Sequence, residues 1–254
     1  MLHLHSVLNP DELAQARAAL QAADWEDGRV TSRSLPASIN SNRQLPQQGA
    51  VAQRLQQMVL QALRRNQLFF SAALPRRIAP PMFNRYEGQH GDYLDDHVDV
   101  ALRFLPCGER VRTDMSCTLF LSDPQEYEGG ELVLQDTWRD EAIKLAAGDL
   151  LLYTGDRIHR VNPVTRGCRL ACFFWLESMV RRDEQRRLLF QMARDLVRLR
   201  AEAQGAPSPA VLGLTGRITT CCACGRRSEI CLKSKNVKFQ AIEIFVSYKN
   251  IVRV

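Results

Sequence analysis

The chain has 254 residues, 45% hydrophobic and 24% charged, as expected for a globular protein with one large domain and additional helices. No apolar run approaches the roughly 18 residues of a membrane span, and the first residues lack the pattern of a signal peptide, so we expect a cytoplasmic protein with no membrane partner. The net charge of +6 belongs to residues 217–254, which hold eight Lys or Arg and two Asp or Glu, whereas residues 1–216 hold 26 of each sign.

The first 77 residues favour helices. Asn9 is positioned to cap a helix, and Glu12 three residues later completes a capping-box pattern. A second helix is predicted over residues 50–67, where apolar residues recur on one face. Residues 27–48 between them are polar and irregular. We therefore predict an N-terminal helical region over residues 1–77 that packs on the core.

Residues 78–178 consist of short apolar runs separated by turns, which favours an all-β sandwich or barrel. Strands are predicted over residues 82–86, 94–104, 115–121, 131–135, 150–153 and 169–176. A helical pattern returns over residues 181–203 and belongs to a C-terminal helical region over residues 179–216. The leucines that we expect to point inward in that helix are Leu188, Leu189, Leu196 and Leu199.

A candidate metal site lies in the β-rich stretch. His97 and Asp99 are two residues apart on a predicted strand, so their side chains are expected on the same face. Of the five histidines, His159 follows the 150–153 strand and is the expected third ligand. Two imidazoles and one carboxylate on an octahedral ion leave three open positions, two for a bidentate 2-oxo acid and one for O2.

Two further residues suit the 2-oxo acid. Arg169 follows His159 by ten residues, and its planar fork can bind a remote carboxylate bidentately. Tyr86 precedes the His97 strand and can donate its hydroxyl to the same co-substrate. A single histidine or arginine is usually a structural or solvated residue, so the prediction depends on the whole set in this order. We predict no catalytic residue beyond the metal site.

The sequence resembles the bacterial PKHD-type hydroxylases, which are relatives of the prolyl and lysyl hydroxylases. The resemblance covers residues 1–216 and is carried by segments such as FNRYEGQHGDYLDDHVD (83–99), RTDMSCTLFLSDPQEYEGGELV (112–133) and AAGDLLLYTGDRIHRVNPVTRGCR (146–169). It implies a mainly β protein with flanking helices (α+β), in which residues 78–178 form a double-stranded β-helix of the jelly-roll, cupin-like type.

The resemblance also implies an Fe(II)- and 2-oxoglutarate-dependent dioxygenase. In that family pattern His97, Asp99 and His159 hold the iron, Arg169 binds 2-oxoglutarate, and L-ascorbate (vitamin C) keeps the iron ferrous. The expected reaction uses O2 to hydroxylate an unidentified peptidyl or siderophore-like substrate, with release of succinate and CO2 and a link to iron homeostasis.

Two alternative functions are a non-catalytic iron and 2-oxoglutarate sensor and a nucleic-acid demethylase on the same fold. The neutral charge of residues 1–216 argues against a nucleic-acid partner. We therefore expect a small-molecule or peptidyl substrate, and a homo-oligomer is compatible with the sequence.

Residues 217–254 depart from the resemblance, because family members usually end in a helix resembling Tyr-His-Asn-Leu-Leu-Arg-x-Trp. One permitted set of codons for residues 217–229, read one base out of frame, encodes Tyr-His-Asn-Leu-Leu-Arg-Leu-Trp-Ala-Glu-Val and a stop. Our hypothesis is that a frameshift near Gly216 produced an aberrant tail. Its cysteines offer one C-x-x-C pair and no histidine, so we expect accidental thiols instead of a zinc site: Cys221, Cys222, Cys224 and Cys231.

Overall fold

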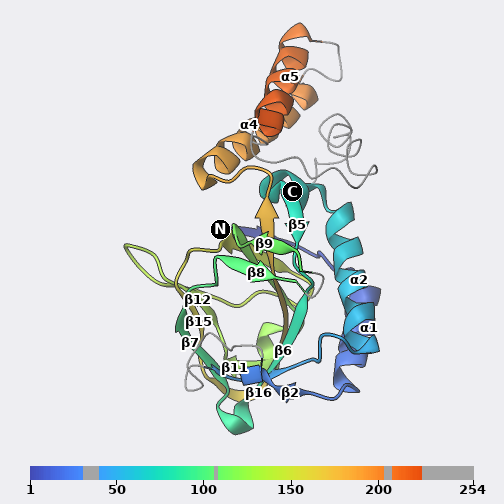
Figure 1. Cartoon of the computed structure of the whole chain (residues 1–254), viewed down its shortest axis with the longest axis vertical. Coiled ribbons are helices and arrows are strands. Elements are labelled where there is room, and N and C mark those ends of the chain that lie inside the picture. The colour runs from blue at the N-terminus through green and yellow to red at the C-terminus, as the bar shows by residue number, and fades with distance from the viewer. Residues whose placement is uncertain (31–39, 106–107, 203–207, 225–254) are drawn as a thin grey trace. The chain divides into compact units, whose positions relative to one another are not determined.

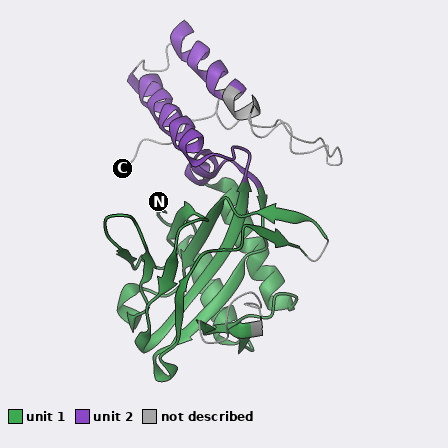
Figure 2. Cartoon of the chain, turned by 60° about the vertical axis from the view of Figure 1, so that its left-hand side comes forward, with its two compact units in different colours: residues 1–66, 77–177 green, residues 67–76, 178–254 purple. Residues whose placement is uncertain are grey.

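The computed structural model describes residues 1–30, 40–105, 108–202 and 208–224 (Figure 1). The chain divides into two compact units (Figure 2). The first unit comprises residues 1–66 and 77–177, and the second comprises residues 67–76 and 178–254. The two units are described separately below.

Two antiparallel sheets form most of the first unit. The larger sheet has the order β1 (Leu2–Leu4), β14 (Leu150–Thr154), β10 (Met115–Phe120), β16 (Val164–Ser178), β6 (Met82–Glu87), β4 (Arg43–Gln44) and β2 (Glu26–Asp27). The smaller sheet has the order β13 (Glu141–Ile143), β12 (Leu132–Leu134), β15 (His159–Val161), β7 (Tyr93–His97) and β3 (Asn40–Ser41). The additional pairs involve β5 (Pro75–Ile78) and β11 (Tyr127–Gly129), which each pair with β16, and β8 (Leu102–Phe104), which pairs with β9 (Arg110–Arg112). Short 3-10 helices among the described residues are η1 (Gly28–Val30), η3 (Gly88–His90) and η4 (Pro124–Glu126).

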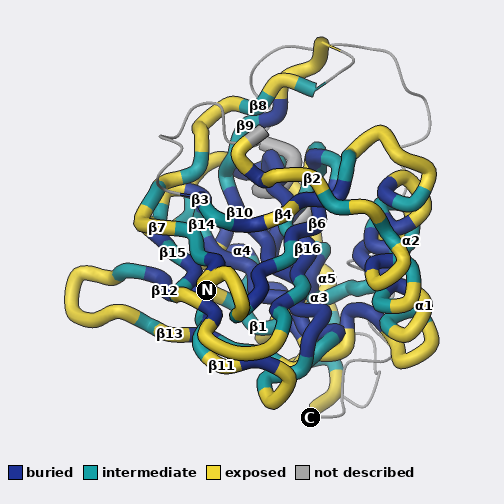
Figure 3. Tube along the Cα trace, turned by 90° about the horizontal axis from the view of Figure 1, so that it is seen from below, coloured by how far each residue is buried: buried dark blue, intermediate teal, exposed yellow. Residues whose placement is uncertain are grey.

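The core of this unit lies between the two sheets. Apolar side chains of β10 and β14 in the larger sheet pack with those of β12 and β15 in the smaller one, and Leu134 and Val164 are fully buried among them. Removal of these side chains from water is the main favourable contribution to the fold. Figure 3 shows buried residues along both sheets, whereas the loop between β12 and β13 is exposed.

Two helices belong to the first unit, and the sequence explains where the first of them begins. α1 (Pro10–Gln21) has the predicted capping box, because Asn9 Oδ1 accepts the Glu12 N–H at 2.9 Å and Glu12 Oε2 accepts the Asn9 N–H at 3.0 Å. α2 (Ala50–Arg65) ends two residues earlier than predicted, with Asn66 in an extended conformation. Burial of an apolar side chain such as Leu55 on α2 contributes about 1.5–3 kcal/mol to stability.

The structure differs from the predictions in two segments of this unit. Residues 27–48 were expected to be irregular, but they include β3 and β4, which pair with β7 and β6 respectively. The strand expected over residues 94–104 is broken, because β7 ends at His97 and β8 begins at Leu102. The partner strand explains the break: β15 begins at His159, which is the residue paired with His97.

The second unit contains α3 (Gln67–Ala73), α4 (Asp183–Glu202) and α5 (Pro209–Cys224). Its core includes Leu189, Leu196 and Ile218. Leu188 and Leu199 are 56% and 42% exposed, so the expectation that they point inward was wrong. The expected change of sequence character at residue 217 lies inside α5, and residues 225–254 lie outside the described residues. None of the described helices is long and apolar enough to cross a membrane.

Candidate metal and co-substrate site

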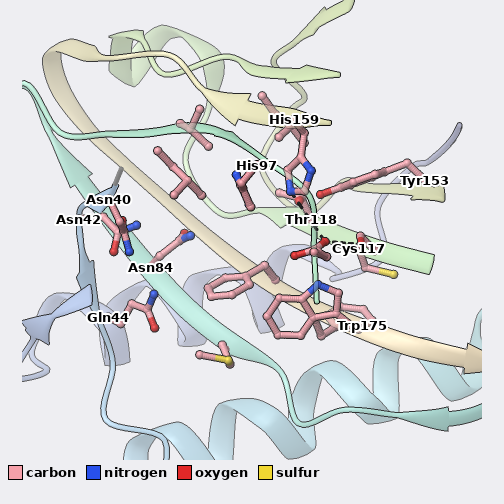
Figure 4. A pocket seen from close by; sticks show the side chains of 18 of the residues that line it. Asn40, Asn42, Gln44, Asn84, His97, Cys117, Thr118, Tyr153, His159 and Trp175 are labelled. Atoms are coloured by element: carbon pink, nitrogen blue, oxygen red, sulfur yellow. Dashed lines mark hydrogen bonds and ion pairs between the residues drawn. The ribbon is translucent and has the colours of Figure 1, made fainter. Parts of the chain in front are cut away.

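A cavity of about 260 Å³ in the first unit is lined by residues of both sheets. Figure 4 shows two histidines on one side of this cavity and a group of side-chain amides on another. The histidines are His97 and His159, and the amides are Asn40, Asn42, Gln44 and Asn84. The cavity therefore brings together potential metal ligands and hydrogen-bonding groups from strands that are distant in sequence.

The two histidines are neighbours because their strands are paired. His97 at the end of β7 lies opposite His159 at the start of β15, and the ring centroids are 4.1 Å apart. His97 Nδ1 is 2.8 Å from the carbonyl oxygen of Asp95, and His159 Nδ1 is 3.0 Å from that of Arg157. A proton donated to each carbonyl leaves the Nε2 lone pair of both rings available to a metal ion. Burial and the adjacent His159 lower the pKa of His97, which favours the neutral ring that ligation requires.

Asp99 completes this group from the segment that follows β7. Its Oδ2 atom lies 3.8 Å from His159 Nε2 and accepts a hydrogen bond of 2.6 Å from Ser116 Oγ on β10. One ligand atom from each of the three residues lies within 4.8 Å of the others. The prediction that His97 and Asp99 share a strand face was wrong, since Asp99 lies beyond the strand end, yet the structure brings the three predicted residues together.

These residues fit a divalent iron ion. Two imidazoles and one carboxylate form the facial donor set of non-haem Fe(II) oxygenases, which keeps positions open for other ligands. Two backbone carbonyls and Ser116 orient the donors, as partners of metal-binding residues commonly do. Arg103 adds a cation beside the carboxylate, with Nη2 3.9 Å from Asp99 Oδ1.

Arg169 provides a buried cation in the same cavity. The residue lies on β16, is 1% exposed and pairs with Tyr86 on β6. Its guanidinium carbon is 5.3 Å from the centre of the Tyr86 ring and 5.4 Å from that of Phe120. No carboxylate among the described residues forms an ion pair with Arg169, and its Nε atom has no hydrogen-bond partner there. A buried charge without a counter-ion is costly, so this part of the cavity suits an anion such as the remote carboxylate of a 2-oxo acid.

The Tyr86 hydroxyl is held by two amides. Asn42 Nδ2 and Asn84 Nδ2 donate to its oxygen at 3.0 and 3.3 Å. Because the oxygen accepts both bonds, the hydroxyl proton remains available to an acceptor in the cavity. Burial raises the pKa of Tyr86, so the group stays protonated as a donor at neutral pH.

Several residues of the site were missed in the sequence. The clearest available signal was the alternation of Asn40, Asn42 and Gln44, which places amides at every second position of a short extended segment. Ser116 carries no comparable signal, because its role depends on Asp99 in another segment. Arg103 was also missed. Its guanidinium carbon lies 3.0 Å from the centre of the Trp175 ring, and burial lowers its pKa to about 10.

The chain is similar in sequence to known proteins. Residues 81–177 match the family model of the 2OG-Fe(II) oxygenase superfamily. The chain is 52% identical over 216 residues to a PKHD-type hydroxylase of Variovorax paradoxus (strain S110), covering 85% of this chain and 94% of the relative. A PKHD-type hydroxylase of Stenotrophomonas maltophilia (strain R551-3) is 50% identical with the same coverage, 85% and 94%.

One solved structure supports the fold. A prolyl hydroxylase from Trichoplax adhaerens, in complex with a hypoxia inducible factor peptide fragment, has a TM-score of 0.50 and 17% identity, covering 74% of this chain and 86% of that chain. The predicted fold class, mainly β with flanking helices and a double-stranded β-helix, is confirmed.

Proposed function

We propose specific roles for the cavity residues on the premise that this chain belongs to the PKHD-type hydroxylase family of 2OG-Fe(II) oxygenases. Membership of this family makes the protein a 2-oxoglutarate-dependent dioxygenase that requires Fe(II), 2-oxoglutarate and O2. The proposed iron ligands are His97, Asp99 and His159. The observation that carries this assignment is the convergence of their three ligand atoms within 4.8 Å of one another.

The proposed 2-oxoglutarate site is Arg169 with Tyr86. Arg169 would pair with the remote carboxylate through its planar fork, and Tyr86 would donate its hydroxyl proton to the same group. When bound, iron and 2-oxoglutarate supply the oxidation chemistry, in which O2 is consumed, succinate and CO2 are released and the primary substrate is hydroxylated. The walls of the cavity would hold the reactants in a fixed orientation. We propose ascorbate as the reductant that keeps the iron ferrous.

For the primary substrate we propose a peptidyl or siderophore-like molecule, with a role in iron homeostasis. Two side-chain amide oxygens at the cavity support this proposal. Asn42 Oδ1 and Asn84 Oδ1 are buried at the cavity and have no hydrogen-bond partner among the described residues. An amide oxygen without a partner accepts a hydrogen bond, so these two atoms suit a group that brings N–H or O–H donors, as amides of both substrate types do. Family membership favours this hydroxylase function over the sensor and the nucleic-acid demethylase.

An anaerobic binding experiment tests the site assignment. Fe(II) and 2-oxoglutarate are added to the purified protein, and the visible charge-transfer absorption of chelated 2-oxoglutarate on iron is recorded. We expect the band in the wild type and its loss in Asp99→Ala. His90→Ala is the matched control, because His90 is a histidine outside the cavity lining. A full band in folded Asp99→Ala protein would refute the ligand assignment.

A further inference from the structure

A second group of two histidines and one aspartate lies at the edge of the larger sheet. His3 belongs to β1, His5 follows that strand, and Asp149 directly precedes β14. His3 Nε2 is 2.7 Å and His5 Nδ1 is 3.3 Å from the same oxygen, Asp149 Oδ2. The three potential ligand atoms all lie within 4.8 Å of one another. None of these residues lines the cavity described above.

The arrangement is held by the backbone. Strand pairing places His3 opposite Leu151 and Leu4 opposite Leu150, which brings the end of β1 to the start of β14, beside Asp149. The Asp149 main chain is fixed, because its carbonyl accepts the Phe120 N–H at 2.9 Å and its own N–H donates to Ala146 at 3.1 Å. The donors are therefore positioned before any ion arrives, which lowers the ordering cost of binding.

The residue after His5 adds to this constraint. Ser6 has a φ of +46°, which is uncommon for a residue other than glycine. In this conformation its N–H donates to Asp149 Oδ1 at 2.8 Å. Val7 follows, with its N–H 2.8 Å from the Gly148 carbonyl oxygen in the turn before β14. One carboxylate oxygen of Asp149 is thus held by the backbone, and the other faces both imidazoles.

The charge environment also suits a cation. The Asp149 side chain is 8% exposed, and its ion-pair partners among the described residues are the two histidines, with no lysine or arginine. The imidazole of His5 is 75% exposed, so an ion can enter from solvent. Two imidazole nitrogens and a carboxylate oxygen favour zinc, nickel, copper or iron over magnesium or calcium, which prefer oxygen ligands alone.

We propose that His3, His5 and Asp149 form a second binding site for a divalent transition-metal ion, separate from the cavity. Three protein ligands leave positions for water, so the ion stays accessible to solvent. By joining β1 to the start of β14, the bound ion fastens the N-terminal strand to the larger sheet. The site therefore links metal binding to the stability of this edge.

Nickel binding to full-length protein without a histidine tag tests the proposal. Equilibrium dialysis against Ni(II), followed by metal analysis, counts the ions bound per chain. We expect His5→Ala to bind one ion fewer than the wild type, or to bind it at least tenfold more weakly. His159→Ala removes a different ion, that of the cavity, so failure of one site is distinguished from failure of the other. All variants keep the same cysteines, so any nickel bound by thiols is the same in each. The readout is the difference in bound nickel between the variants.

Three additions make the result decisive. His90→Ala is the control for loss of an exposed histidine and is expected to bind as many ions as the wild type. Asp149→Asn keeps an oxygen for the Ser6 N–H while removing the ligand oxygen, and it is expected to lose the same ion as His5→Ala. In the wild type, Co(II) is expected to shift the imidazole proton resonances of His3 and His5. Equal nickel binding by wild type and His5→Ala, or unshifted resonances, would overturn the proposal.

Discussion

The two histidine–aspartate groups of the first unit have the same donors but different surroundings. In the cavity group, His159 is 5% exposed and Arg169 is buried in the same cavity. In the edge group, His5 is exposed, and Asp149 has no arginine or lysine as an ion-pair partner among the described residues. A donor set alone can bind a metal ion. A donor set beside a cavity that also holds a buried cation can combine that ion with an oxo acid.

The largest expected effect distinguishes the two groups directly. His159→Ala removes a proposed iron ligand, so conversion of 2-oxoglutarate to succinate should fall to the background rate. His5→Ala should cause a much smaller loss, because the edge group takes no part in binding 2-oxoglutarate. Succinate formation is measured at saturating Fe(II) and 2-oxoglutarate. Similar losses in the two variants would show that the groups are not functionally distinct.

The orientation of Asp99 is the next point of difference. Ser116→Ala removes the 2.6 Å hydrogen bond to Asp99 Oδ2. Partners of this kind typically change metal affinity about 10- to 100-fold, so we expect Fe(II) affinity to fall within that range while the fold is retained. Anaerobic Fe(II) titration measures the change, with Ser71→Ala, a buried serine outside the cavity lining, as the control. Unchanged affinity would show that Asp99 is oriented without Ser116.

The buried cation should contribute specifically to 2-oxoglutarate binding. Arg169→Leu removes a charged hydrogen-bond donor worth about 2 kcal/mol, which corresponds to roughly thirtyfold weaker binding of 2-oxoglutarate. Arg169→Lys should retain only part of the affinity for 2-oxoglutarate, because the ammonium keeps the positive charge but cannot bind the carboxylate with two parallel hydrogen bonds as the planar fork does. Calorimetric titration of the Mn(II)-loaded protein with 2-oxoglutarate measures both. Loss of Mn(II) binding in Arg169→Leu would instead indicate a structural role.

The smallest expected effect concerns the Tyr86 hydroxyl. Tyr86→Phe should weaken 2-oxoglutarate binding by about 1 kcal/mol, the usual contribution of one neutral hydrogen bond. Asn42→Leu should also weaken 2-oxoglutarate binding, because Asn42 acts through the same hydroxyl. The losses in binding free energy of the two single variants should therefore not add up in the double variant. Titration of all three variants gives the interaction energy. Full additivity would mean that Asn42 does not act through Tyr86.

The hypothesis of a frameshift near Gly216 concerns the C-terminal part of the second unit. α5 crosses this position, and Ile218 is buried in the core of that unit. Resequencing the gene tests the hypothesis, because codons that cannot encode the family-like ending in the shifted frame would reject it.

Local signals were sufficient for many elements. The capping box at Asn9 and the apolar runs of β10 and β14 depend on residues close together in the chain, and the structure has these elements near the predicted positions. The predictions failed where long-range pairing decides the conformation. Residues 94–104 alternate like one strand, but β7 stops where its partner begins, and the short strands β3 and β4 have too few apolar residues to be recognised.

The sequence alone identified the family, because residue type, order and spacing are sufficient for that resemblance, and the resemblance implied the fold class, the predicted iron ligands and Arg169. The tertiary structure decided how those residues are oriented. The hydrogen bond from Ser116 to Asp99, the hydrogen bond from Asn42 to Tyr86 and the approach of His5 to Asp149 each join distant segments. Such contacts depend on which strands pair and in which register, and no local pattern specifies the partner.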